Sequence, residues 1–112
     1  MYKKGDVCLV CLDPTMGVEI KKTRPVVIVS NNWINQHPQL VVIVPLTTNI
    51  DRLSPSHVLI PQGCGDIDHD SKVVTEQIRA IDKKRIVRTL GTSDAKVFAE
   101  VCNALKNTLD FW

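Results

Sequence analysis

Thr23-Arg-Pro-Val-Val-Ile-Val-Ser30 and Leu40-Val-Val-Ile-Val-Pro-Leu-Thr47 are the two stretches that decide the fold of this chain. Each is a run of β-branched apolar residues too short for a typical helix, and such runs are typical of strands buried on both faces. Pro25 and Pro45 are expected at the strand ends, where a missing N–H costs least. The connection between the runs is too short for a parallel crossover, so the strands are predicted to pair antiparallel. This pairing brings Arg24 and Thr47 together at one open end.

Shorter elements are predicted on either side of this hairpin. Strands are expected at residues 6–12, 57–60 and 72–79, and helical turns fit within the connection 31–39 and at 82–85. Apolar residues at helical spacing predict a C-terminal helix from Asp94 to Phe111, which Thr92 or Ser93 can cap. Several short strands and one terminal helix indicate a mostly β, α+β fold, a small barrel or sheet with the helix packed on it.

Composition indicates one domain over residues 1–112, with 44% hydrophobic and 23% charged residues, as in ordinary globular proteins. No apolar run approaches a membrane span and the N-terminal stretch does not resemble a signal peptide, so we expect a cytoplasmic protein with no membrane contact. The net charge is only +2, but basic residues gather at 21–24 and again at 79–88. Such patches suit a polyanion, or they are plain solvated surface.

Two patterns suggest a metal and are rejected. Cys8 and Cys11 have the C-x-x-C spacing of zinc and redox sites, but side chains three apart on a strand point to opposite faces, so we expect neither zinc nor a disulfide between them. The acids of 66–70 imitate the start of a calcium loop, but Ser71 and Gln77 stand where that loop needs a glycine and a glutamate. No metal and no cofactor are therefore expected.

Five short motifs follow one another along the chain. They are Gly5-Asp-Val7, Leu12-Asp-Pro-Thr-x-Gly17-x-Glu19, Lys22-Thr-Arg-Pro-Val26, Pro45-Leu-Thr-Thr48 and Glu76-Gln-Ile-Arg-x-Ile-Asp82. Together they resemble the MazF/PemK family, the toxins of bacterial type II toxin–antitoxin systems, over nearly the whole chain. The resemblance implies an SH3-like barrel, a homodimer, and a sequence-selective, metal-independent endoribonuclease acting on single-stranded RNA. It also implies a cognate antitoxin whose partly disordered segment covers the RNA site.

The resemblance assigns catalysis to Arg24 and Thr47, and it matches the family's loop glutamate to Glu19. The residue chemistry agrees, because RNA supplies its own nucleophile in the 2′-OH and leaves the enzyme to stabilise charge at phosphorus and to move two protons. Arg24 can donate two parallel hydrogen bonds to phosphate oxygens, Thr47 can donate to the same oxygens, and Glu19 can accept the 2′-OH proton. The expected products carry a 2′,3′-cyclic phosphate and a 5′-hydroxyl.

Each of these residues can also have a role with no part in catalysis. Arg24 can pair with Glu19 or Glu76 at the surface, Thr47 can be a strand-end hydroxyl, and Glu19 can be a solvated loop acid. On a strand over 72–79, Glu76 and Gln77 would face opposite sides, Gln77 would bond within the fold or to a base, and Arg79 could touch phosphate. The candidate RNA-binding residues are Lys21, Lys22, Thr48, Asn49, Gln77 and Arg79.

Other readings of the chain remain open. The histidines His37, His57 and His69 fall in no recognisable motif, so a two-histidine ribonuclease mechanism is not favoured. Cys11 stands where relatives often have an acid. A rival function is that of related SH3-like toxins, which inhibit DNA gyrase by binding without catalysis. A third is a domain that kept the fold as an antitoxin-binding or regulatory module.

Overall fold

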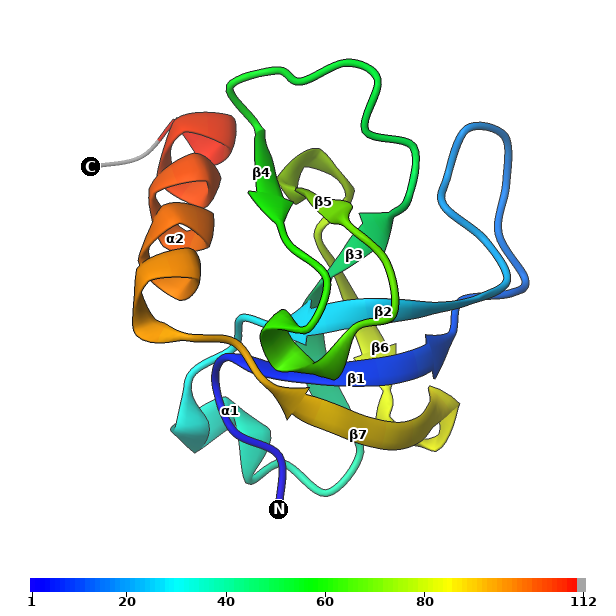
Figure 1. Ribbon diagram of the computed structural model, residues 1–112. Coiled ribbons are helices and arrows are strands. Elements are labelled where there is room, and N and C mark those ends of the chain that lie inside the picture. The colour runs from blue at the N-terminus through cyan, green and yellow to red at the C-terminus, as the bar shows by residue number, and fades with distance from the viewer. Residues whose placement is uncertain (111–112) are drawn as a thin grey trace.

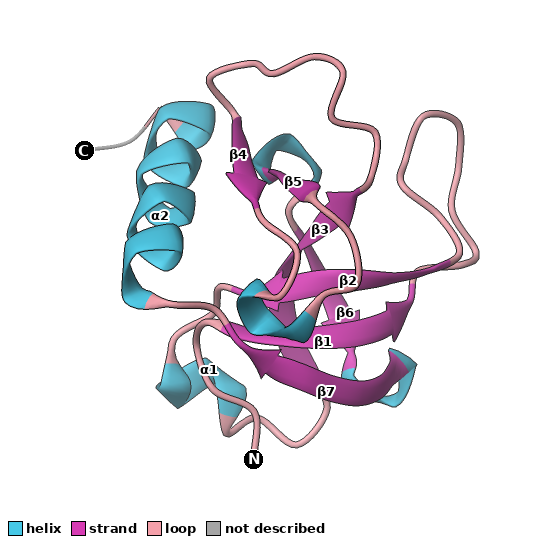
Figure 2. Cartoon of the chain, in the orientation of Figure 1, coloured by secondary structure: helices cyan, strands magenta, loops and turns pink. Residues whose placement is uncertain are grey.

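An antiparallel sheet carries most of the chain in the computed structural model, which describes residues 1–110 (Figure 1). Its strands are β1 (Asp6–Cys11), β2 (Thr23–Ile28), β3 (Leu40–Thr47), β4 (His57–Ile60), β5 (Ser71–Val74), β6 (Arg79–Asp82) and β7 (Ile86–Thr92). They lie in the order β4-β5-β3-β2-β1-β7, and β6 also pairs with β3. Two α-helices, α1 (Asn32–Asn35) and α2 (Ala95–Leu109), and three 3₁₀ turns, η1 (Cys64–Asp66), η2 (Thr75–Gln77) and η3 (Lys83–Arg85), complete the fold (Figure 2). The predicted mostly β fold with a C-terminal helix is confirmed.

The central hairpin is antiparallel, as predicted. Val26 pairs with Pro45 and Ile28 with Ile43, and all four residues are buried. The two prolines are not at the strand ends, because β2 begins two residues before Pro25 and β3 continues two residues beyond Pro45. Pro45 is tolerated there because β3 changes partner at this point on its other edge, from β6 at residues 40–43 to β5 at 46–47.

The single strand predicted over 72–79 is wrong. The chain forms β5, turns through η2, and then forms β6. Both strands lie along the same edge of β3, so the chain must step from one end of β3 to the other between them. Thr75, fully buried in the step, donates its hydroxyl to the carbonyl of Ser56 at 2.7 Å. Glu76 and Gln77 consequently lie in a turn, where strand alternation does not apply.

The strand β7 was not predicted, although it extends the sheet beyond β1. Its sequence alternates only weakly between apolar and polar residues, and much of the strand is exposed. The helical turns expected within 31–39 and at 82–85 are confirmed as α1 and η3.

Two apolar cores hold the sheet together. One lies between the sheet and α2 and includes Val27, Leu46 and Val101, while the other lies on the opposite face and includes Val26, Ile43 and Cys8. The hairpin strands contribute to both cores, which explains their unbroken apolar sequence. No helix among the described residues is long and apolar enough to cross a membrane.

The helix α2 begins one residue later than predicted and has a different cap. Asp94, and neither Thr92 nor Ser93, is the N-cap, because its carboxylate accepts the N–H of Val97 at 2.8 Å. The predicted end at Phe111 lies outside the described residues. Figure 1 shows α2 standing beside β4 at one side of the sheet.

Cys8 and Cys11 both lie on β1, as the sequence predicted. Cys8 is buried in the second core, paired with Val26, while Cys11 is half-buried near the strand end, paired with Thr23. Burial raises the pKa of the Cys8 thiol, a hydrogen bond with Thr89 opposes this, and the charge of Asp6 adds to it. Cys8 is therefore a protonated, apolar core residue at neutral pH.

Candidate active site

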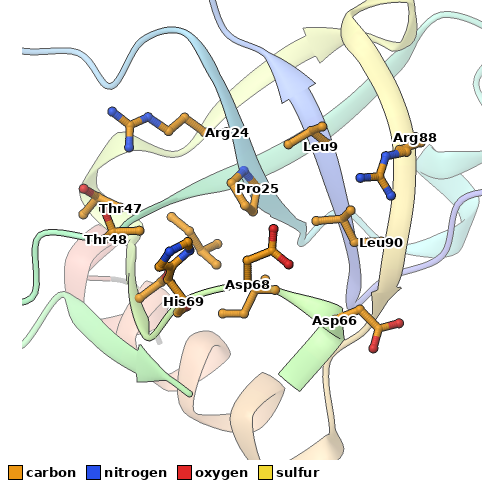
Figure 3. Close-up of a pocket in the computed structure, with 13 residues that line it drawn as sticks. Leu9, Arg24, Pro25, Thr47, Thr48, Asp66, Asp68, His69, Arg88 and Leu90 are labelled. Atoms are coloured by element: carbon orange, nitrogen blue, oxygen red, sulfur yellow. The ribbon is translucent and has the colours of Figure 1, made fainter. Parts of the chain in front are cut away.

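Arg24 and Thr47 lie beside each other at the open end of the hairpin. The β2–β3 pairing ends at Val26 with Pro45, and Arg24 and Thr47 each lie two residues beyond this last pair, on the same faces of their strands as Val26 and Pro45. Both side chains line one pocket of about 430 Å³, and Figure 3 shows them on the same side of it. The structure thus brings together the two residues that the sequence placed at the centre of the site.

Local hydrogen bonds orient both side chains and leave donors available. The Nε–H of Arg24 donates to the carbonyl of Lys21 at 3.2 Å, and within residues 1–110 its two terminal nitrogens have no protein acceptor. The N–H of Asn49 donates to Thr47 Oγ1 at 3.3 Å. Because this contact uses a lone pair of the Thr47 oxygen, the hydroxyl hydrogen remains able to donate. Two terminal guanidinium nitrogens and a hydroxyl therefore face solvent at one point, which suits a phosphate.

The same pocket holds four charged or titratable residues that the sequence did not assign to it. They are Asp66 and Asp68, His69 and Arg88 (Figure 3). The first three come from the segment between β4 and β5, and Arg88 comes from β7. None of these four side chains has a hydrogen bond or an ion pair with another group among residues 1–110. The pocket is therefore a polar site of mixed charge with its groups free of internal partners.

A glycine allows the segment between β4 and β5 to reach the pocket. Gly65 in η1 has a φ of 62°, and a Cβ built there would lie 2.4 Å from Val7 Cγ2. Only glycine fits this close approach and this backbone conformation. The segment consequently packs directly on β1, and the residues that follow Gly65 run along the pocket wall.

Glu19 does not lie in the pocket of Arg24 and Thr47. Its carboxylate accepts the N–H of Met16 within the exposed β1–β2 loop, and it lines a second pocket together with Gln77 and Arg79. The contact between Arg24 and either Glu19 or Glu76, considered as a plain surface role, is not formed. The assignment of Glu19 as general base remains a prediction that the pocket geometry does not support.

Gln77 and Arg79 make contacts within the fold. Gln77 Oε1 accepts the N–H of Ile20 at 2.6 Å, and its amide donates to the carbonyl of Val18 at 3.4 Å. Arg79 donates to the carbonyl of Leu12 at 3.3 Å. Both side chains therefore tie the β1–β2 loop to the sheet, and this loop carries Lys21 next to Arg24.

Thr47 also lines a third pocket, with Asn49, His57, Lys72, Glu76 and Gln77. Lys72 pairs with Thr47 in the β3–β5 register, and its Nζ donates to the carbonyl of Arg52 at 2.7 Å. Nothing in the sequence placed Lys72 or His57 beside Thr47, because that position depends on the pairing of β5 with β3. Thr47 is the residue that joins the first and third pockets.

His57 and Glu76 form a pair in this third pocket. The N–H of Ser54 donates to His57 Nδ1 at 3.1 Å, so the ring proton is on Nε2, which contacts Glu76 Oε2 at 3.1 Å. Burial would raise the pKa of Glu76, but hydrogen bonds from its own backbone N–H, from Ser56 and from His57 bring that pKa below its ordinary value. The carboxylate is therefore ionised at neutral pH.

The remaining candidate RNA-binding residues lie around the Arg24–Thr47 pair. Thr48 lines the first pocket, Asn49 lines the third, and Lys21 and Lys22 are exposed in the loop before β2. Among the described residues, no group of three metal-ligating side chains converges.

Comparison with known proteins points to one family. Residues 3–109 match the family described as a PemK-like, MazF-like toxin of type II toxin–antitoxin systems. The chain is 35% identical to the endoribonuclease MazF9 of Mycobacterium tuberculosis over 117 residues, with coverage of 100% of the chain and 99% of the relative. It is 37% identical to an endoribonuclease MazF of Staphylococcus epidermidis over 110 residues, with coverage of 97% and 92%.

Solved structures share the fold. A mycobacterial endoribonuclease in complex with its cognate antitoxin superposes with a TM-score of 0.83 at 25% identity, with coverage of 100% of this chain and 98% of the other. A MazF from Deinococcus radiodurans superposes with a TM-score of 0.84 at 24% identity, with coverage of 98% and 97%. The mostly antiparallel sheet with its C-terminal helix is therefore the fold of these proteins.

Proposed function

The chain belongs to the PemK-like, MazF-like family of toxins of type II toxin–antitoxin systems, whose homologues include MazF endoribonucleases, and we propose that it cleaves single-stranded RNA sequence-selectively and without a metal. The observation that carries the proposal is the Arg24–Thr47 pair, with its unpartnered donors in one pocket. The 2′-oxygen attacks phosphorus and the bond to the 5′-oxygen breaks. The products are a 2′,3′-cyclic phosphate and a 5′-hydroxyl.

Arg24 supplies the main charge stabilisation in this proposal. As the 2′-oxygen bonds to phosphorus, negative charge grows on the non-bridging oxygens, and two parallel N–H donors of the guanidinium match their geometry. Because the Nε–H contact with Lys21 holds the guanidinium before RNA arrives, little reorganisation is needed in the transition state. The Thr47 hydroxyl donates to the same phosphate, held by Asn49.

In this proposal the bound RNA strand runs from the first pocket past Thr47 into the third pocket. Thr47 lines both the first and the third pocket, so a phosphate held there places the nucleotides on either side into different pockets. Thr48 contacts the strand on one side, Asn49 contacts it on the other, and Lys21 and Lys22 of the exposed loop contact its backbone. Glu19 and Arg79 contact RNA only beyond these nucleotides, from the second pocket, whereas Gln77 lines both the second and the third pocket.

Two assemblies accompany this function. We propose an isologous homodimer, because a second copy doubles the basic rim and lengthens the groove for several nucleotides. We also propose that an acidic, partly disordered segment of a cognate antitoxin lies over Lys21, Lys22 and Arg24 and competes with RNA. A structural relative crystallised with its cognate antitoxin supports the second assembly.

The test is incubation of the purified protein with a pool of single-stranded RNA in EDTA. We expect cleavage at a defined sequence, with products that polynucleotide kinase can label at the 5′-hydroxyl without prior phosphatase treatment. Light scattering should show a dimer, and added antitoxin should stop cleavage. RNA left intact under these conditions, together with inhibition of DNA gyrase, would favour the rival, non-catalytic toxin.

A further inference from the structure

The chemistry proposed above needs two proton transfers that Arg24 and Thr47 do not account for. The 2′-hydroxyl must lose a proton, and the 5′-oxygen must gain one because an alkoxide is a poor leaving group. Glu19, the acid that the sequence offered for the first transfer, lines another pocket and is engaged by Met16. The groups for both transfers therefore have to be sought among the other residues of the Arg24–Thr47 pocket.

Resting on that proposed function, we propose that His69 is the general acid that protonates the leaving 5′-oxygen, and that the neighbouring Asp68 accepts the 2′-hydroxyl proton. Both residues line the pocket of Arg24 and Thr47. Figure 3 shows the imidazole next to Thr48 and the Asp68 carboxylate pointing into the pocket below Pro25. An imidazole changes charge between about pH 5 and 8, so it can give up a proton at neutral pH.

The backbone that carries these two side chains is fixed on both sides. Ile67, before them, is buried in the core beside α2, and Ser71, after them, is buried at the start of β5. The Ser71 hydroxyl donates to the carbonyl of His69 at 2.9 Å. The N–H of Gln62 donates to the carboxylate of Asp70 at 2.8 Å. Asp68 and His69 are therefore exposed side chains on a rigid segment, as positioned acid–base groups require.

The other two histidines do not offer the same chemistry. His57 is engaged through both ring nitrogens, with Ser54 and Glu76. His37 lies beyond α1 and lines a different, apolar pocket with Trp33 and Leu40. Among the described residues, His69 is thus the histidine that lies in the pocket with the phosphate-binding pair.

The surrounding charges are mixed in sign. Arg24 of β2 and Arg88 of β7 line the pocket together with His69, and so do Asp66 and Asp68 from its own segment. The pocket therefore combines cationic side chains, which suit a phosphate, with side chains that can exchange protons.

The 2′-oxygen forms a bond to phosphorus while its proton passes to the Asp68 carboxylate. The bond between phosphorus and the 5′-oxygen breaks, and the proton of the His69 imidazolium passes to that oxygen. Afterwards the imidazole takes a proton from water and Asp68 releases one, so the enzyme returns to its starting state with no other reactant.

The test compares two short RNAs that contain one cleavage site. One has the natural 5′-oxygen at the scissile bond, and the other has sulfur in its place, because a thiolate leaves without protonation. In single-turnover assays, His69→Gln should cleave the oxygen substrate about 10²-fold more slowly than wild type and the sulfur substrate at nearly the wild-type rate. His37→Gln, the matched control, should cleave both as wild type does. Equal losses on both substrates, or none on the oxygen substrate, would overturn the role of His69.

Asp68→Asn tests the other proton transfer and should show no selectivity between the two substrates. Because the 2′-hydroxyl must be deprotonated with either leaving group, this variant should be slower on both substrates. Cleavage of both at the wild-type rate would overturn the role of Asp68.

Two further measurements separate chemistry from binding and from the function itself. The Kd for an uncleavable RNA with a 2′-deoxy nucleotide at the scissile position should be unchanged by His69→Gln. The wild-type rate on the oxygen substrate should fall as pH rises through the imidazole titration, and the variant should lack that decrease. If the wild-type protein cleaves neither substrate, the proposed ribonuclease function fails; if it cleaves and His69→Gln shows no selective defect, only this inference fails.

Discussion

Replacement of Arg24 by alanine is the most direct perturbation of the proposed site. The side chain is half-exposed at the end of β2, and its only hydrogen bond within residues 1–110 goes to the carbonyl of Lys21. Loss of one such bond costs roughly 0.5–1.5 kcal/mol of folding stability, so the variant should remain folded. Loss of a donor aimed at developing charge costs about 2.7–4 kcal/mol in the transition state, or about 10²–10³ in rate. The effect on cleavage should therefore far exceed the effect on stability.

Related variants separate charge from geometry. Arg24→Lys keeps the charge but cannot make two parallel hydrogen bonds, so it should not restore the full rate. Thr47→Val removes the hydroxyl at constant shape and should slow cleavage, while Thr47→Ser keeps the donor and should cleave nearly as wild type does. If Arg24 and Thr47 act on one phosphate, the double variant Arg24→Ala/Thr47→Val should lose less than the sum of the two single losses.

The assay is single-turnover cleavage of a short labelled RNA in EDTA, with circular dichroism as the folding control. Lys96→Ala, which removes a positive charge from the exposed start of α2, is the matched control and should cleave at the wild-type rate. A folded Arg24→Ala protein that cleaves RNA as fast as wild type would refute the mechanism. The non-catalytic, gyrase-binding function would then become the better explanation of the fold.

Three further predictions concern stability and titration. Leu46→Ala should lower the free energy of unfolding by about 2–5 kcal/mol, because Leu46 is 1% exposed in the core beside α2; Leu53→Ala, at a side chain 54% exposed, should change it by less than about 0.5 kcal/mol in the same urea titration. Because burial raises its pKa, Cys8 should react with a thiol reagent more slowly than Cys11 in the native protein, and equal rates would contradict its buried place in β1. The pKa of Glu76 is lower in the folded protein than in the unfolded chain, so the stability that its carboxylate adds should be present above the unfolded pKa and disappear as pH falls through the folded pKa. Glu76→Gln should remove this pH dependence of stability. A Glu76 titration midpoint at or above the ordinary value, measured by NMR, would contradict the prediction.

Much of the central architecture could be predicted from local sequence. Two apolar stretches separated only by residues 31–39 allow little besides a buried antiparallel hairpin, and this pairing brings Arg24 and Thr47 to one open end. The helix α2 was equally visible, because its apolar residues repeat at helical spacing. These predictions succeeded because each depends on one short segment and on the faces that the segment buries.

The predictions failed where two segments compete for one edge. A single strand was predicted over residues 72–79, yet this stretch contains most of β5, the turn η2 and the first residue of β6, because β5 and β6 pair with opposite ends of β3. For the same reason Glu76 and Gln77 lie in a turn. The exposed strand β7 lacked a clear alternation and was missed, although it brings Arg88 to the pocket.

The sequence by itself determined the hairpin, the helix, the family and the Arg24–Thr47 pair. Only the tertiary structure decided which other side chains share their pocket. Asp68 and His69 lie more than twenty residues from Thr47 along the chain and have no motif of their own. They reach the site because Gly65 packs against Val7 and because β5 pairs with the end of β3. Local periodicity reports which face of a segment is buried, whereas membership of a pocket depends on contacts between distant segments, and no short stretch of sequence encodes these.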